Sequence, residues 1–400
     1  MSTSTTAIKA TVTVGTGKVS KTVAYYAAFI ALGLTAASLG PTLSGLAQHT
    51  QTHLNEISFL FSARSLGYLI GSLISGRLYD RVPGHMVMGG VLVVMAALLA
   101  LLPVMPLVWL LIAVMLVLGM AEGGVDVGGN TLLVWVHRGQ VGPFMNGLHF
   151  FFGVGAFLAP IIIAQAVLMS GDITWAYWAL AVLVLPAAVR VLRLPSPVPE
   201  ASSQEGVTGR VSVLLVILIA LFLFLYVGAE VGFGGWIFTY TTASRLSSQA
   251  VAYYLTSAFW GALTVGRLLA IPIATRLRPR SVLLIDLIGC LISIGVILLW
   301  PGAIAAVWVG TLGAGLAMAS IFPTTISLAE SRLAITGQVT SWFFVGASLG
   351  GMSVPWLIGQ LFEPVGPQVA IWIIMTDLMM AVGIFVVLML SARRAVGKQE

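Results

Sequence analysis

Residues 107–135 read LVWLLIAVMLVLGMAEGGVDVGGNTLLVW, a predominantly apolar run whose only charged side chains are Glu122 and Asp126. An α-helix rises about 1.5 Å per residue, so about 20 apolar residues cross a hydrocarbon core of about 30 Å. This run is therefore long enough to span a bilayer as one helix. The whole chain has the same character, because 59% of its 400 residues are hydrophobic, 8% are charged and the mean hydropathy is +1.04. Soluble proteins carry roughly 25% charged residues, so the composition excludes a water-soluble fold.

Similar apolar runs lie on both sides of this one, separated by charged or Pro/Gly-containing breaks. Twelve spans of about 20 residues use about 240 residues, which a chain of 400 accommodates with short loops. We predict an all-α integral membrane protein with twelve transmembrane helices in two pseudo-symmetric six-helix bundles. The predicted helices cover residues 20–46, 54–79, 86–104, 107–135, 141–169, 174–194, 211–240, 249–275, 281–300, 303–330, 334–362 and 368–392.

The positions of Lys and Arg support this count and set an orientation, because cytoplasmic loops of membrane proteins are enriched in both residues. With the N-terminus in the cytoplasm, sixteen of the 19 Lys and Arg residues fall in cytoplasmic segments. Arg245 alone falls in an outside loop, and Arg64 and Arg267 lie within spans. We predict a multi-pass protein of the plasma (inner) membrane with both termini cytoplasmic. This topology, rather than nucleic-acid binding, explains the net charge of +6.

A polar segment divides the chain into two halves. Residues 195–209 (PSPVPEASSQEGVTG) are rich in Pro and Ser, as expected of a linker. Gly71, Gly76, Arg77 and Leu78 recur 190 residues later as Gly261, Gly266, Arg267 and Leu268. Two related halves predict alternating access around a central site. We predict a flexible cytoplasmic tail at 1–19, bundles at 20–194 and 211–392, a linker at 195–210 and a cytoplasmic tail at 393–400.

The end of the second predicted helix reads GRLYDRVPGH over residues 76–85. This string resembles the cytoplasmic signature of the major facilitator superfamily, in which a glycine, a leucine two residues on, an Asp-Arg pair, a further glycine and basic residues follow one another. The resemblance implies that Gly76 allows close helix approach and that Asp80 and Arg81, with Arg267 in the second half, take part in gating. The second glycine comes one residue late, and His85 replaces a fixed positive charge, which predicts a weaker or pH-sensitive latch.

Other strings narrow the resemblance to one branch. The acidic-to-Asn spacing of Asp126 and Asn130 is similar to that of fucose-permease-like transporters. The strings MNGLHFFFGVGA (145–156), YVGAE (226–230), SAFWG (257–261) and FPTTISL (322–328) look like the sodium-dependent glucose transporter 1 branch. This resemblance implies solute uptake, with sugars as cargo and a proton or a sodium ion as the driving ion.

Charged groups inside a membrane cost at least about 2.5 to 3.5 kcal/mol each, so each one is a functional candidate. Glu122, Asp126 and Asn130 recur at every fourth position and share one helix face. Two carboxylates one turn apart repel when both are ionised, which favours protonation of one. We predict ion coupling at Asp126, Glu122 and Glu230. The alternative for Glu122 and Asp126 is a permanent pair with an arginine that only holds helices together.

Depth in the membrane predicts partners for these charges. Asp126 and Arg267 lie at similar depth, as do Glu230 and Arg64, so we predict these two pairs as partners that rearrange. Glu230 also lies in the glycine-rich stretch 228–236, where we predict unwound backbone that contacts a solute or ion. Asp286 is expected to snorkel into the basic loop at 276–280. For Asp377, a pairing role and a transport role both remain open.

Uncharged side chains complete the predicted solute site. Trp236 and Trp260 offer flat faces for a pyranose ring, Asn130 and Asn146 can bond hydroxyls, and His149 can share a proton near neutral pH. Tryptophans and lone histidines in apolar helices are more often packing residues, and that alternative stays open.

We infer a secondary active transporter, an ion-coupled symporter of a sugar or similar polar solute, acting as a monomer in the bilayer. The alternative is a proton-coupled antiporter exporting amphipathic compounds, because GAFLAP (155–160) is a degenerate form of an antiporter motif. A membrane sensor or lipid-modifying enzyme lacks an appended domain and a catalytic constellation. No phosphate-binding loop or His-Glu-x-x-His motif is present, and Cys290 is the single cysteine. We therefore predict no enzymatic activity, no cofactor, no metal site and no nucleic-acid partner.

Overall fold

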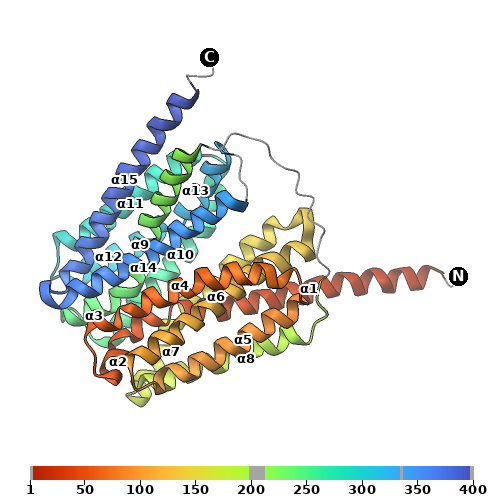
Figure 1. The fold of residues 1–400 in the computed structure, drawn as a ribbon, viewed down its shortest axis with the longest axis horizontal. Helices are drawn as coiled ribbons and strands as arrows, with labels where there is room; N and C mark the ends of the chain where they lie inside the picture. The colour runs from red at the N-terminus through yellow and green to blue at the C-terminus, as the bar shows by residue number, and fades with distance from the viewer. Residues whose placement is uncertain (1–2, 198–211, 334–336, 397–400) are drawn as a thin grey trace.

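The computed structural model describes residues 3–197, 212–333 and 337–396. These residues form helices and connecting turns without a β-strand in the described ranges (Figure 1). The helices of the first half are α1 (Thr3–Ala36), α2 (Leu39–Thr50), α3 (Leu54–Ile57), α4 (Phe59–Tyr79), α5 (Gly84–Leu101), η1 (Leu102–Val104), α6 (Val108–His137), η2 (Arg138–Gln140), α7 (Gly142–Ser170) and α8 (Ile173–Leu192). Those of the second half are α9 (Val213–Ala243), α10 (Gln249–Ala274), α11 (Pro279–Leu299), α12 (Ile304–Met318), α13 (Ile321–Glu330), α14 (Gly337–Val365) and α15 (Gln368–Val396).

Twelve segments of the described chain are long and apolar enough to cross a membrane, which confirms the predicted number of spans. Their bounds agree with the predicted ranges to within a few residues at most ends. Large apolar side chains such as Trp109 and Leu299 are exposed on the outer surface, as expected for side chains that face lipid. The predicted linker at 195–210 lies mostly outside the described residues. Helices α1 and α15 extend into the predicted tails at 1–19 and 393–400.

Two of the predicted helices are broken, and a proline follows each break closely. The first span is interrupted between α1 and α2 at residues 37–38, and the tenth is interrupted between α12 and α13 at residues 319–320. Pro41 and Pro323 each lie four residues after the start of a break, and a proline has no N–H to bond the carbonyl four residues earlier. The expectation of unwound backbone at 228–236 is wrong, because α9 is continuous from Val213 to Ala243.

Glycines allow the closest helix pairs inside each half. In the first half, a Cβ on Gly155 of α7 would lie 2.1 Å from the carbonyl oxygen of Ile30 on α1. In the second half, a Cβ on Gly350 of α14 would lie 1.9 Å from the carbonyl oxygen of Phe224 on α9. Only glycine fits at such a backbone contact. The first and fifth spans of one half and the first and fifth spans of the other therefore pack by the same device.

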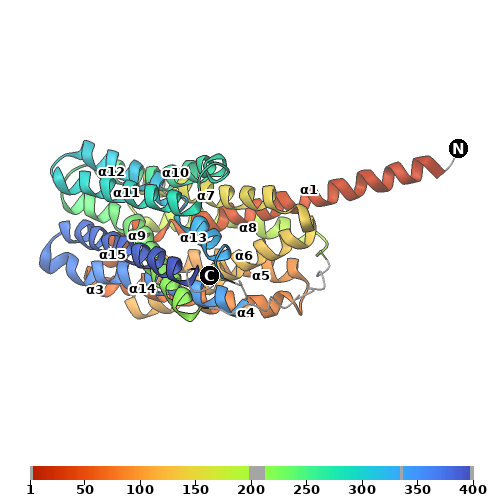
Figure 2. The ribbon, with the colours of Figure 1, turned by 90° about the horizontal axis from the view of Figure 1, so that it is seen from above.

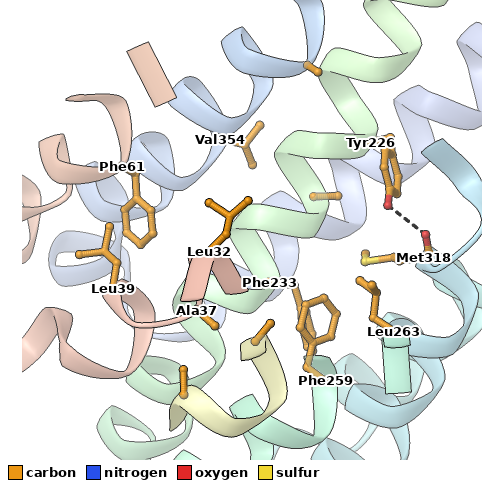
Figure 3. Close-up of a cluster of buried hydrophobic side chains, with 14 of the residues drawn as sticks. Leu32, Ala37, Leu39, Phe61, Tyr226, Phe233, Phe259, Leu263, Met318 and Val354 are labelled. Carbon is orange, nitrogen blue, oxygen red and sulfur yellow. Dashed lines mark hydrogen bonds between the residues drawn. The ribbon is translucent and has the colours of Figure 1, made fainter. Parts of the chain in front are cut away.

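The two halves meet at the end of the molecule that carries α2 and α3, and their helices diverge toward the end that carries both chain termini (Figure 1). Helix α7 lies beside α10, as the view from above shows (Figure 2), and the Ser257 hydroxyl donates to the Phe157 carbonyl at 2.6 Å. Helix α4 lies beside α14, where the Ser62 hydroxyl donates to the Met352 carbonyl at 2.9 Å. Apolar side chains of both halves belong to one buried cluster, which includes Leu39 and Phe61 from the first half and Phe233 and Val354 from the second (Figure 3).

Candidate functional site at the centre of the bundles

Helix α6 carries the predicted acidic face on uninterrupted helix from Val108 to His137. Its glycines let α4 approach closely, since a Cβ on Gly119 would lie 2.0 Å from the Arg64 carbonyl oxygen and one on Gly123 would lie 2.4 Å from that of Tyr68. The side chains of Arg64 and Tyr68 are therefore held against the acidic face.

Glu122 forms a buried ion pair with Arg64. The Arg64 Nε donates to Glu122 Oε2 at 2.7 Å, and the Glu122 side chain is 1% exposed. The second oxygen, Oε1, makes no hydrogen bond to any described residue. A buried pair of this kind binds two helices to each other, which is the alternative that the sequence left open for Glu122.

Asp126, one turn further along α6, is half-buried and bonded to neutral groups. The Tyr68 hydroxyl donates to Asp126 Oδ2 at 2.6 Å, and the Asn130 amide donates to Oδ1 at 3.2 Å and to the Asp126 carbonyl at 2.8 Å. No arginine or lysine among the described residues forms an ion pair with Asp126. Its carboxylate is thus oriented by hydrogen bonds while remaining able to bind a cation.

His149 is a further titratable side chain near this carboxylate. It lies on α7, packs edge-on against the Phe29 ring at 5.8 Å between ring centroids, and is within electrostatic range of both Asp126 and Arg267. Arg267 on α10 faces Glu230 on α9, with Arg267 Nη2 4.0 Å from Glu230 Oε1 and side-chain exposures of 26% and 13%. This pair is longer and more accessible than the Arg64–Glu122 pair.

The predicted charge partners were wrong in both cases. Arg64 pairs with Glu122 instead of Glu230, and Arg267 pairs with Glu230 instead of Asp126. Each ion pair lies within one half, so neither salt bridge joins the two halves. The halves are instead in direct contact here through α7 and α10, where a Cβ on Gly153 would lie 2.2 Å from the Thr264 hydroxyl oxygen.

The uncharged candidates separate into accessible and covered groups. Asn146 is exposed on α7, three residues from His149. Trp260 is half-buried beside Gly234, and its indole N–H has no partner among the described residues. Trp236 is completely buried, stacks on Phe362 with ring centroids 5.0 Å apart, and donates to the Pro355 carbonyl at 3.0 Å. Both faces available for a sugar ring at Trp236 are thus occupied by packing in this conformation.

The signature at residues 76–85 forms the end of α4 and the turn into α5. Asp80 and Arg81 are exposed there, and no heavy atom lies within 4 Å of the position of a Cβ on Gly76. Close helix approach at Gly76 is therefore not observed. His85 is 2% exposed, with Nδ1 2.8 Å from the Leu194 carbonyl and Nε2 2.7 Å from the Tyr25 hydroxyl. It ties α1, α5 and the end of α8 together instead of offering a charge at the surface.

Several polar contacts were not expected from the sequence. The Tyr226 hydroxyl donates to the Met318 carbonyl at 2.9 Å, at the break between α12 and α13 (Figure 3). The Ser320 hydroxyl, in the same break, donates to the Asp286 carboxylate. Asp286 therefore does not snorkel into the basic loop as expected. Pro323 was the available signal, because a proline inside a span predicts a broken helix that needs polar partners.

Asp377 on α15 remains without a cationic partner in the described part of the chain. It is 3% exposed, and its Oδ2 makes no hydrogen bond to a described residue. A pairing role, one of the two readings open from the sequence, is thus not observed in this conformation. Within the described ranges, no group of three or more His, Cys, Asp or Glu side chains is placed to hold a metal ion.

Comparison with known proteins places this arrangement in context. The pattern of the Major Facilitator Superfamily matches residues 25–355. The chain is 32% identical to sodium-dependent glucose transporter 1A of Mus musculus, over 84% of this chain and 88% of that protein. It is 35% identical to sodium-dependent glucose transporter 1 of Xenopus laevis, over 81% of this chain and 72% of that protein.

A solved structure shares the fold at low sequence identity. A variant of the nucleoside transporter NupG superposes with a TM-score of 0.72 at 14% identity, over 94% of this chain and 99% of that chain. These matches confirm the resemblance drawn from the signature and the branch strings, and they confirm the predicted arrangement of twelve helices in two six-helix bundles.

Proposed function

Because the chain belongs to the major facilitator superfamily and is a membrane transporter of a small solute rather than an enzyme, we propose that it takes up a sugar or a similar neutral polyol by ion-coupled symport. Asp126 is the residue at which the coupling ion, a proton or Na⁺, binds. The observation that carries this proposal is the position of Asp126: it is half-buried, it is oriented by the Tyr68 hydroxyl and the Asn130 amide, and it forms no ion pair with a described arginine or lysine.

The coupling has a simple electrostatic basis. A carboxylate left charged and without a counter-ion opposes closure of the halves around it, because removing it from water is costly. Binding of a proton or Na⁺ at Asp126 removes that cost, so closure requires the ion. Glu122 is assigned a structural role with Arg64, whereas the looser Glu230–Arg267 pair is assigned a role in rearrangement between conformations.

The solute is assigned to the same central region. Asn130, Asn146 and His149 supply polar groups from the first half, and the half-buried Trp260 supplies a ring face from the second. Sugars suit such a set, because they combine hydroxyl groups with apolar ring faces. The two relatives named as sodium-dependent glucose transporters support a sugar as cargo and Na⁺ as the coupling ion.

We assign the end with both termini to the cytoplasm, in the plasma membrane, from the Lys and Arg distribution. The observed conformation is then closed on the outside. The bundles formed by residues 20–194 and 211–392 move relative to each other in a monomer, and the linker at 195–210 joins them.

Proteoliposomes with separately imposed Na⁺ and pH gradients test the proposal. We expect a Na⁺ or proton gradient to drive accumulation of labelled D-glucose, and Asp126→Asn to retain exchange of labelled for unlabelled sugar while losing accumulation. Asp172→Asn is the matched control, because Asp172 caps α8 outside the membrane centre and asparagine caps equally well. Undiminished accumulation by Asp126→Asn would refute the assignment. An inward proton gradient that expels an amphipathic compound would instead favour the antiporter.

A further inference from the structure

An open hollow of about 470 Å³ lies at the end of the molecule where the two halves converge. Side chains of both halves line it, with Ser44, Gln48 and Gln51 from the first half and Thr239, Thr242 and Gln249 from the second. Its volume is within the range of about 300 to 1,000 Å³ that is typical of small-molecule sites.

The hollow continues the seam between α2 and α9. A Cβ on Gly40 of α2 would lie 2.8 Å from the Gly234 carbonyl oxygen and 2.9 Å from Gly235 Cα, so the backbones touch at this level. One turn further out, Ser44 and Thr239 hydroxyls are 3.4 Å apart. Another turn out, Gln48 and Thr242 line the hollow. The space therefore widens outward from a closed contact that must part when the halves open at this end.

The lining suits a neutral polyol more than an ion. Among the residues that the structure describes, no lysine or arginine lines the hollow. Its one carboxylate, Glu363, is already engaged by His53 Nδ1 at 3.3 Å and by the Leu54 N–H at 3.0 Å. The side-chain amides of Gln48, Gln51 and Gln249 make no hydrogen bond to another described residue. Free amides and hydroxyls at several points are the groups that bond the hydroxyls of a sugar.

We propose that this hollow is an external binding site for the neutral polyhydroxylated solute, occupied before the α2–α9 seam parts. The inference rests on the proposed function for the identity of the solute and on the assignment of this end to the outside. It adds a second, outer site to the central one at Asp126, and it assigns initial selection of the solute to the amides of the outer mouth.

Cysteine labelling tests the site independently of transport. Cys290 is completely buried, so a cysteine placed at Gln48 is the one expected to react with a membrane-impermeant maleimide. We expect D-glucose added outside to slow labelling of Gln48→Cys about threefold or more, and equal osmolarity of betaine to leave it unchanged. His49→Cys is the matched control, because His49 is exposed beside Gln48 but does not line the hollow. Equal slowing at both positions, or no slowing at either, would overturn the proposal.

Transport kinetics provide a second measurement that separates this inference from the proposed function. We expect the double variant Gln48→Ala/Gln249→Ala to raise the external half-saturation concentration for D-glucose entry about three- to tenfold, the effect of losing one or two modest hydrogen bonds. The internal half-saturation concentration for exit should not change. The control variant Gln140→Ala alters an exposed glutamine at the opposite end, and it should change neither the external nor the internal half-saturation concentration. Absence of uptake of every labelled hexose, pentose and polyol tried with the parent protein refutes the proposed function, and if another of these solutes is taken up instead of D-glucose, that solute becomes the probe. Unchanged entry kinetics in the double variant, with uptake present, refute the outer site.

Discussion

The buried Arg64–Glu122 pair makes a quantitative prediction about which charges hold the fold and which serve transport. Replacing Glu122 with Leu leaves the Arg64 guanidinium, whose side chain is 18% exposed, without its partner at 2.7 Å. Breaking a buried pair in this way costs about 3 to 5 kcal/mol, and the partial exposure of Arg64 places the expected value near the lower limit. About 3 kcal/mol corresponds to a change of more than about a hundredfold in the unfolding equilibrium.

The assay is thermal or denaturant unfolding of the purified protein in detergent, followed by the loss of the monodisperse species. Glu122→Leu and Arg64→Met should each be strongly destabilised, while Arg64→Met/Glu122→Leu should recover most of the lost stability, because an apolar pair of similar volume replaces the ion pair. Glu230→Leu is the comparison variant, and its cost should be smaller because the Glu230–Arg267 distance is 4.0 Å and both groups are more exposed. A double variant as unstable as the single ones would refute a purely structural pair. A stable double variant without sugar exchange would assign the pair to the transport cycle.

Three further predictions concern the closed end and the helix break. Gly40→Val should hold the α2–α9 seam open, because the added side chain meets backbone atoms of Gly234 and Gly235. Opening is measured as increased maleimide labelling of a cysteine introduced by Thr239→Cys. Gly90→Ala, at an open position on α5, is the control. Glu363→Ala should favour opening of this end more than Glu363→Gln, since glutamine still accepts from the Leu54 N–H. Glutamine loses only the exposed contact with His53, which is an ion pair when His53 is protonated and is then worth about 0 to 1 kcal/mol. Equal labelling of Thr239→Cys in both variants would contradict this. Asp286→Ala should cost about 1.5 to 3 kcal/mol of stability by leaving the Ser320 hydroxyl without its charged acceptor. Asp286→Asn should cost less, because the amide oxygen can still accept this hydrogen bond. Unfolding in detergent compares the two variants, and equal losses of stability would argue against the hydrogen bond.

The span pattern was predictable because a single physical requirement governs it. Every backbone polar group in a bilayer core must be bonded within the chain, so apolar length alone identifies a helix such as α6. The breaks at 37–38 and 319–320 were missed, although Pro41 and Pro323 removed the donors for the carbonyls of residues 37 and 319. The glycines at 228–236 suggested unwound backbone, but they serve as contact points on a continuous helix: Gly234 faces Trp260 and Gly235 faces Phe61.

The partners of the buried charges were missed for a different reason. Depth along a helix follows from residue counting, but the direction of a side chain depends on which helices are neighbours. Small residues at four-residue spacing contained part of that information, since Gly67 and Gly71 on α4 face α6, and Gly119 and Gly123 on α6 face α4. Two such rows predict that these two parallel helices pack closely, and close packing brings Arg64 against Glu122 and Tyr68 against Asp126. The same reasoning explains why Asp126 forms no ion pair with a described arginine or lysine: the arginine of its neighbouring helix is already paired with Glu122 one turn away.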